Sequence, residues 1–181
     1  MEIDGALHDV GRRLFDLRGP DLHLHTADAR PFLRTTDRRW DAIAVDAYRQ
    51  PYIPFYLVTR EFFQEVHDHL EPGGTVMVNV GHPEGSERLE KVLAATMGTA
   101  FAHVMRDPSE DINTILLASD APLSAATLAA TAPPAGLEAT GREAAGRLAP
   151  ALPGGDVYTD DRAPVEWLID ASIVEVAADG D

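Results

Sequence analysis

Three acidic residues stand at the ends of predicted strands, where a carboxylate can meet a small ligand. They are Glu2, Asp28 and Asp46. In an open parallel sheet, ligands bind beyond the carboxyl ends of the strands. One such carboxylate can accept hydrogen bonds from the two hydroxyls of a ribose, and the next can accept one from an adenine amino group. Each acid taken alone is better explained as the cap of the following helix, but three at successive strand ends favour a nucleoside site.

The loop that follows Asp46 carries side chains suited to a substrate pocket. Aromatic and polar groups there can contact an acceptor molecule, but a loop that holds Pro51 and Pro54 also commonly uses aromatic residues as a lid over the core. Both interpretations stay open at this point. The candidates for substrate binding are Tyr48, Arg49, Gln50 and Tyr52.

A second acidic pair, Asp160 and Asp161, precedes the segment Arg162-Ala-Pro near the end of the chain. In a functional interpretation these carboxylates lie at the acceptor side of the site. In the alternative interpretation they cap a helix and form an ion pair with Arg162, which is at least as well supported.

The seven histidines do not form a recognisable metal site. His67 and His69 are two residues apart on a predicted helix and therefore do not face the same way. His23 and His25 share one face of a predicted strand, but no third ligand is evident. Because a catalytic zinc ion needs three protein ligands and a structural one needs four, no metal is expected.

Helices and strands must position these residues. Along the chain, the spacing of apolar residues alternates between helix-like and strand-like, which predicts an α/β fold with a mainly parallel sheet. Pro72-Gly73-Gly74 is expected to end one helix and turn the chain. Predicted helices cover residues 4–17, 29–34, 59–70, 86–97, 123–131 and 136–148, with a last one from Pro164, and predicted strands cover 22–28, 40–46, 75–80, 100–106 and 112–119.

Length and composition are those of one globular domain. The 181 residues, 45% of them hydrophobic, suffice for a core, and we expect one domain over residues 1–170, with an Ala/Pro/Gly-rich helical insertion at 121–155 and an acidic tail at 171–181.

The net charge of −15 disfavours nucleic acid and anionic membranes as partners. The absence of cysteine, of a signal peptide and of a long apolar run fits a cytoplasmic protein.

An ordered set of motifs resembles the spermidine synthases, the polyamine aminopropyltransferases, and their bacterial homologues. The resemblance covers residues 1–119 and 156–168. Its Asp-Ala and Pro-Gly-Gly pieces are shared with many S-adenosylmethionine-dependent methyltransferases. The matching segments are Glu2-Ile-Asp-Gly, Gly11-Arg-Arg-Leu-Phe, Asp28-Ala-Arg-Pro-Phe-Leu, Trp40-Asp-Ala-Ile-Ala-Val-Asp-Ala-Tyr, Thr59-Arg-Glu-Phe-Phe, Leu70-Glu-Pro-Gly-Gly, Asn79 and Thr159-Asp-Asp-Arg-Ala-Pro-Val-Glu-Trp.

The resemblance implies a Rossmann-like, methyltransferase-type domain with helices on both faces of its sheet. It implies decarboxylated S-adenosylmethionine, or S-adenosylmethionine itself, as co-substrate and an amine as acceptor, with no other cofactor. The family's ribose-binding acid falls on Glu2, its adenine-side acid on Asp28 with Ala29 beside it, and its catalytic acid on Asp46.

Two departures from the family pattern bear on function. The family carries a glycine-rich loop on a strand before the matching residues, and this chain starts after it, so we expect a truncated or rearranged site and self-association, as a dimer, through the exposed surface. The family's Asp-Ser-Ser-Asp reads Asp46-Ala-Tyr-Arg49 here. A guanidinium in place of the second acid repels an ammonium and attracts a carboxylate.

The departures leave two alternatives to an aminopropyltransferase. Arg49 favours a methyltransferase-like enzyme, because ordinary S-adenosylmethionine carries a carboxylate. The absent glycine loop favours a catalytically inactive homologue that serves as an interaction module.

Overall fold

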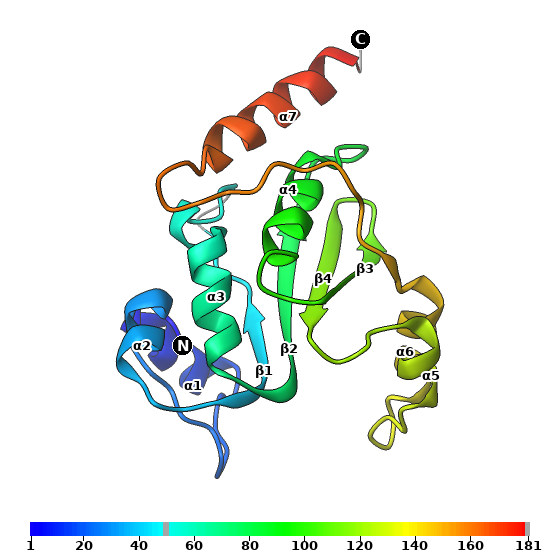
Figure 1. Ribbon diagram of the computed structural model, residues 1–181. Helices are drawn as coiled ribbons and strands as arrows, with labels where there is room; N and C mark the ends of the chain where they lie inside the picture. Colours follow the sequence, from blue (N-terminus) through cyan, green and yellow to red (C-terminus); the bar gives the residue numbers. More distant parts are fainter. Residues whose placement is uncertain (49–50, 180–181) are drawn as a thin grey trace. The chain divides into compact units, whose positions relative to one another are not determined.

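A computed structural model describes residues 1–48 and 51–179 of the chain (Figure 1). The chain divides into two compact units, Met1–Arg38 and Arg39–Asp181, where the sequence predicts one domain over residues 1–170. Residues 171–179, predicted to be an acidic tail, continue the last helix, α7 (Val165–Asp179). This helix is rich in alanine and β-branched apolar residues, so the acidic composition of its end concealed its helical character.

Unit 1 consists of two short helices and very little strand. Asp4 caps α1 (Gly5–Leu14), because its carboxylate accepts a hydrogen bond from the backbone N–H of Ala6 at 2.9 Å. Asp28 caps α2 (Ala29–Thr35) through the N–H of Arg30 at 3.2 Å. The strand predicted from residue 22 is reduced to one parallel bridge between Glu2 and Thr26. A strand needs a neighbour for its backbone groups, and among the described residues only Glu2 provides one here.

Unit 2 is built on a five-stranded mixed sheet in the order β1-β2-β4-β3-β5. Only β1 and β2 run parallel, and the other three pairs are antiparallel. The predicted α/β class is confirmed, but the parallel part of this sheet is limited to its first pair, because the turn at residues 111–112 joins β3 directly to β4 as a hairpin. The strands are β1 (Trp40–Val45), β2 (Leu70–Gly81), β3 (His103–Glu110), β4 (Asn113–Ser119) and β5 (Ala149–Pro150).

Helices α3 and α4 pack side by side against the sheet of unit 2 (Figure 1). Alternation along β2 directs Val76, Val78 and Val80 into the core, and all three are fully buried. The apolar spacing of the helix predicted over residues 59–70 points Phe62, Phe63 and Val66 inward, and all three are buried in α3. Leu70, which the sequence places at the end of that helix, is buried as the first residue of β2. The remaining elements are a 3₁₀ turn η1 (Phe55–Leu57), α3 (Arg60–Asp68), α4 (Arg88–Met97), α5 (Ala125–Ala130) and α6 (Glu138–Arg147).

The Pro72-Gly73-Gly74 segment lies inside β2, where the sequence predicts a turn before the strand. Leu70 pairs with Trp40 and Thr75 pairs with Ala42, so β2 contains extra residues between these two pairs. Gly73 adopts a φ of 81°, which glycine accepts and other residues rarely do. The segment is therefore a bulge that interrupts the pairing register without ending the strand.

Candidate active site

Asp46 and Asn79 meet at the carboxyl ends of the parallel strands β1 and β2. Asp46 is the residue after β1, and its exposed carboxylate accepts a hydrogen bond from the Asn79 amide, Nδ2 to Oδ1, at 2.8 Å. Asn79 lies near the end of β2, beside the buried Val78 and Val80. The parallel pairing thus brings the predicted catalytic acid to a second polar group that is 33 residues away in the sequence. One carboxylate oxygen is oriented by Asn79, and the carboxylate as a whole stays accessible.

Tyr48 connects the same two strand ends through its hydroxyl group. The hydroxyl donates to the backbone carbonyl of Asn79 at 2.9 Å and accepts from the backbone N–H of Gly81 at 2.7 Å. Burial and the neighbouring Asp46 carboxylate raise the Tyr48 pKa, although the bond from Gly81 acts in the opposite direction. The phenol therefore stays protonated, and its polar atom is engaged in holding the β2 terminus. Tyr48 therefore lies beside Asp46, and both hydrogen bonds of its hydroxyl go to backbone groups of β2.

The side-chain oxygen of Asn79 is a buried acceptor without a donor among the described residues. A buried amide oxygen left unbonded costs free energy, so the orientation of this side chain is held by the bond from its amide nitrogen to Asp46. From the sequence, Asn79 is only one of the residues that carry the family resemblance, with no role in the site. Its signal was present, because Asn79 is polar within the apolar strand segment Val76-Met-Val-Asn-Val.

In unit 1 the two predicted nucleoside-binding acids lie at one end of the parallel bridge. Glu2 takes part in the bridge to Thr26, and Asp28 follows two residues later. The Glu2 carboxylate accepts from the backbone N–H of Asp4 at 3.0 Å, and Asp28 caps α2, which begins at Ala29. Asp28 therefore has the capping role that the sequence offered as the alternative, whereas Glu2 bonds the backbone of Asp4, the cap of α1, and is not itself a cap.

The other predicted substrate-binding residues have structural contacts in unit 2. Tyr52 donates to Asp170 of α7 at 2.8 Å. Asp160 accepts from the hydroxyl of Thr59, the cap of α3, at 2.7 Å, so it supports a cap of α3 and does not cap the helix that follows it, and Asp161 is exposed. None of these contacts joins Asp46. The predicted residues Arg49 and Gln50 lie outside the described residues.

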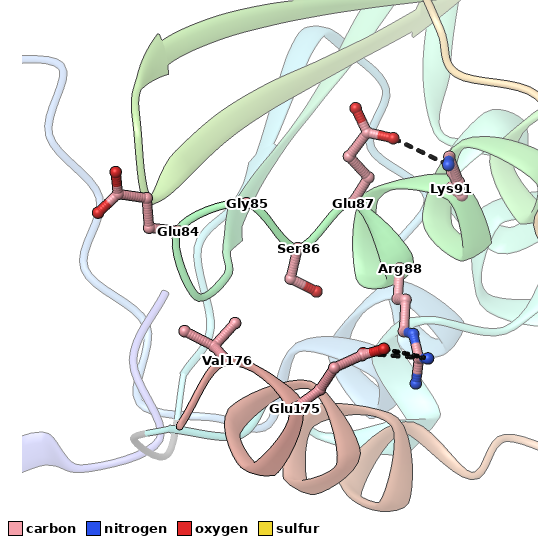
Figure 2. A pocket seen from close by; sticks show the side chains of 8 residues that line it. All are labelled: Glu84, Gly85, Ser86, Glu87, Arg88, Lys91, Glu175 and Val176. Atoms are coloured by element: carbon pink, nitrogen blue, oxygen red, sulfur yellow. Dashed lines mark hydrogen bonds and ion pairs between the residues drawn. The ribbon is translucent and has the colours of Figure 1, made fainter. Parts of the chain in front are cut away.

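A separate pocket of about 670 Å³ lies between the start of α4 and α7 (Figure 2). Its two basic groups are both paired, Lys91 with Glu87 at 2.8 Å and Arg88 with Glu175 at 3.0 Å. The pocket contains none of the residues that the sequence singled out. Among the described residues, no three His, Cys, Asp or Glu side chains gather as a metal-binding group, and no helix has the length and apolar character needed to cross a bilayer.

Comparisons with known proteins identify relatives of the chain. Over 104 residues it is 34% identical to a probable polyamine aminopropyl transferase of Bifidobacterium longum, which covers 57% of this chain and 23% of that protein. Over 123 residues it is 28% identical to a polyamine aminopropyltransferase of Vibrio vulnificus, which covers 65% of this chain and 40% of that protein. The chain is spermidine synthase-like. It spans less than half the length of these two curated relatives.

Solved structures agree with this relationship. The crystal structure of a probable spermidine synthase from Corynebacterium glutamicum matches with a TM-score of 0.62 and 28% identity, over 86% of this spermidine synthase-like chain and 62% of that one. Human methyltransferase-like protein 13 matches at a TM-score of 0.59 and 20% identity, over 81% and 68% of the two chains, which shows the fold alone. The Rossmann-like, methyltransferase-type fold is thereby confirmed. No protein-family model matches the chain.

Proposed function

We propose that this chain binds the nucleoside part of decarboxylated S-adenosylmethionine and uses Asp46 to activate an amine for aminopropyl transfer. The observation that carries the proposal is the accessible Asp46 carboxylate, oriented by Asn79 at the carboxyl ends of two parallel strands. Ligands of open α/β sheets bind at this edge. The names of the curated relatives, polyamine aminopropyl transferases, supply the reaction class.

The proposed reaction is a single displacement. The lone pair of the amine nitrogen attacks the aminopropyl carbon beside the sulfonium, the carbon–sulfur bond breaks, and its electron pair remains on sulfur, which leaves as neutral methylthioadenosine. The new ammonium loses a proton to Asp46 or to water. Free amines have a pKa of about 10, so a carboxylate that removes a proton and orients the nitrogen increases the reactive fraction near neutral pH.

Asn79 has a positioning role in this proposal. Its amide nitrogen holds one Asp46 oxygen at 2.8 Å, and its buried side-chain oxygen lacks a donor among the described residues. Asn79 therefore holds in place the carboxylate that orients the acceptor nitrogen and receives its proton.

Glu2 and Asp28 are the proposed contacts to the nucleoside, and a calorimetric titration with methylthioadenosine tests them. In an Asp28→Ser variant we expect affinity to fall at least about tenfold, because a charge-assisted hydrogen bond is lost. Serine retains the capping oxygen of α2, so the variant preserves the helix start. Asp21→Ser, which changes an exposed acid in the same unit, is the matched control. Undetectable binding by the folded wild-type chain would refute the proposal.

A methyltransferase-like function is the second candidate, and the Arg49 side chain in place of the family's second acid favours it. Arginine pairs with the carboxylate of S-adenosylmethionine, which the aminopropyl donor lacks. A parallel titration with S-adenosylhomocysteine separates the candidates. Tighter binding of this ligand than of methylthioadenosine, lost in Arg49→Ala, would favour methyl transfer.

A further inference from the structure

The strand β1 ends earlier than its parallel partner β2, which lies beside it in the sheet (Figure 1). The last pair of their ladder is Val45 with Val78, whereas β2 continues to Gly81. Backbone N–H and C=O groups at a strand end need hydrogen-bond partners as much as those in its middle. The last residues of β2 therefore need partners on the β1 side that the strand β1 does not supply.

The register of the ladder identifies the residue that is missing. Continued by two residues beyond its last pair, the register would place Ala47 opposite Val80. In a parallel ladder, the residue at such a position donates its N–H to the carbonyl of the residue before its partner. Its own carbonyl accepts from the N–H of the residue after its partner. The backbone of Ala47 is thus the regular partner for the Asn79 carbonyl and the Gly81 N–H.

The hydroxyl of Tyr48 makes both of these bonds in its place. It donates to the Asn79 carbonyl at 2.9 Å and accepts from the Gly81 N–H at 2.7 Å. Burial raises the Tyr48 pKa, so the phenol keeps the proton that the bond to Asn79 uses. A neutral phenol offers one donor and an acceptor, as a backbone residue does. One side-chain group therefore replaces one residue of β1 in the ladder.

This replacement lets the chain leave the sheet at Asp46. The backbone departs directly after Val45, while the Asn79 carbonyl and the Gly81 N–H keep their partners. The Asp46 carboxylate is exposed at the strand end and is held there by the Asn79 amide at 2.8 Å. Tyr48 thus bonds the backbone of the same residue whose side chain orients Asp46.

We infer that Tyr48 is a positioning residue, whose hydroxyl takes the place of the Ala47 backbone and fixes the end of β2 from which Asn79 holds the Asp46 carboxylate. From the sequence, Tyr48 was either a contact to the acceptor or part of a lid over the core, and positioning is a third role. The catalytic consequence rests on the proposed function, whereas the ladder and the Asn79 geometry do not.

Amide hydrogen exchange followed by NMR tests the ladder and needs no activity. Tyr48→Phe keeps the ring and removes the hydroxyl, so the Gly81 amide should exchange at least about tenfold faster. The amide of Val78, within the buried part of β2, should change less than about twofold. Tyr158→Phe removes a hydroxyl from another buried tyrosine of unit 2 and is the matched control, in which Gly81 should keep its wild-type exchange.

The side-chain amide signals of Asn79 test the positioning itself. Asp46→Ala breaks the bond to the Asn79 amide and gives the reference position of these signals in the unbonded state. Tyr48→Phe should shift them toward this reference, because loss of the hydroxyl releases the Asn79 backbone. In Tyr158→Phe they should stay at the wild-type position.

Steady-state kinetics with a diamine acceptor test the catalytic consequence. Tyr48→Phe should lower kcat about tenfold and change KM for the amine less than about twofold, because a residue that acts through Asp46 affects the reaction and not the binding of the acceptor. Combined with Asp46→Asn, the same change should cause no further loss, since no carboxylate is left to position.

Each result bears on the inference. Faster exchange at Gly81 together with shifted Asn79 signals supports the positioning role, and an inactive wild-type chain with these signals refutes the proposed function alone. An unchanged Gly81 amide in Tyr48→Phe overturns the inference, and so do Asn79 signals that stay at the wild-type position. A raised KM at unchanged kcat overturns it as well, because Tyr48 is then an acceptor contact. An additive loss in the double variant does the same, because Tyr48 then acts independently of Asp46.

Discussion

The two units of the chain are stabilised in different ways. In unit 1 the buried side chains are His8, Arg30 and Leu33, two of which are polar. Seven large apolar side chains of this unit are exposed instead, among them Leu7, Leu14 and Phe15. Unit 2 buries aromatic and aliphatic side chains between its sheet and helices. Unit 1 thus depends on caps and single backbone bonds, and unit 2 on a hydrophobic core.

This difference separates the candidate site residues into two classes. Asp46 and Asn79 lie on a sheet that is held by a core, so their geometry is set before any ligand binds. Glu2 and Asp28 lie on a unit with little buried apolar surface, whose small size limits its stability. We expect a ligand to change the dynamics of unit 1 more than those of unit 2.

The largest effect is expected from removal of the Asp46 carboxylate of unit 2. Asp46→Asn should lower aminopropyl transfer by about 10²–10⁴-fold, the range for loss of a general base. Initial rates with a diamine acceptor measure this loss. Asp41→Asn, an exposed acid on the same strand, is the control and should retain the wild-type rate. If the Asp46→Asn variant keeps most of the wild-type rate, then the group that accepts the proton is not the Asp46 carboxylate of unit 2.

Removing one partner of a buried ion pair measures how much the interior of unit 2 contributes to its free energy of unfolding. Glu90 is 1% exposed, and Arg106 donates to both of its oxygens. Glu90→Ala leaves the guanidinium without its partner, so the free energy of unfolding of unit 2 should fall by about 3–5 kcal/mol. Urea denaturation measures this change. Glu87→Ala breaks an exposed pair with Lys91 and should cost less than about 1 kcal/mol. Equal losses of unfolding free energy in Glu90→Ala and Glu87→Ala would contradict the distinction between core and surface pairs.

Matched cap removals compare the two units directly. Thr59 caps α3 in unit 2 and Asp4 caps α1 in unit 1. Thr59→Ala should lower the unfolding free energy of unit 2 by about 1–2 kcal/mol. Asp4→Ala should act locally, with faster amide hydrogen exchange in α1 and no change in the unfolding of unit 2. Global destabilisation by Asp4→Ala would show that the units fold together.

The smallest effect concerns the pH dependence of unit 2. A hydrogen bond to Asp120 at 2.8 Å raises the His67 pKa, and Asp68 adds to this rise. Because the folded pKa is raised, the stabilisation is fully present below the unfolded pKa of about 6.5 and is lost as pH rises through the folded pKa. Both groups are substantially exposed, so the change should stay below about 1 kcal/mol. Urea midpoints across this pH range measure it, and Asp120→Asn should reduce it to the smaller part that Asp68 contributes.

Several elements were predictable from the sequence because their signals are local. Asp4, Asp28 and Thr59 mark helix starts that the structure confirms, since each carboxylate or hydroxyl accepts a bond from an N–H two or three residues later. The segment Ala42-Ile-Ala-Val indicated a strand in unit 2 by its continuous apolar character. The position of Asp46 at the end of that strand followed from the same pattern.

Other features required the tertiary structure. The bulge at Gly73 depends on which residues of β1 lie opposite β2. The Tyr48 hydroxyl bridges residues 79 and 81, and Asn79 orients Asp46, because strand pairing joins positions more than 30 residues apart. A sequence determines the conformation of neighbouring residues through short-range sterics and caps. Which distant polar atoms meet is decided by packing, since burial removes water and leaves each group only the partners that the fold brings within reach.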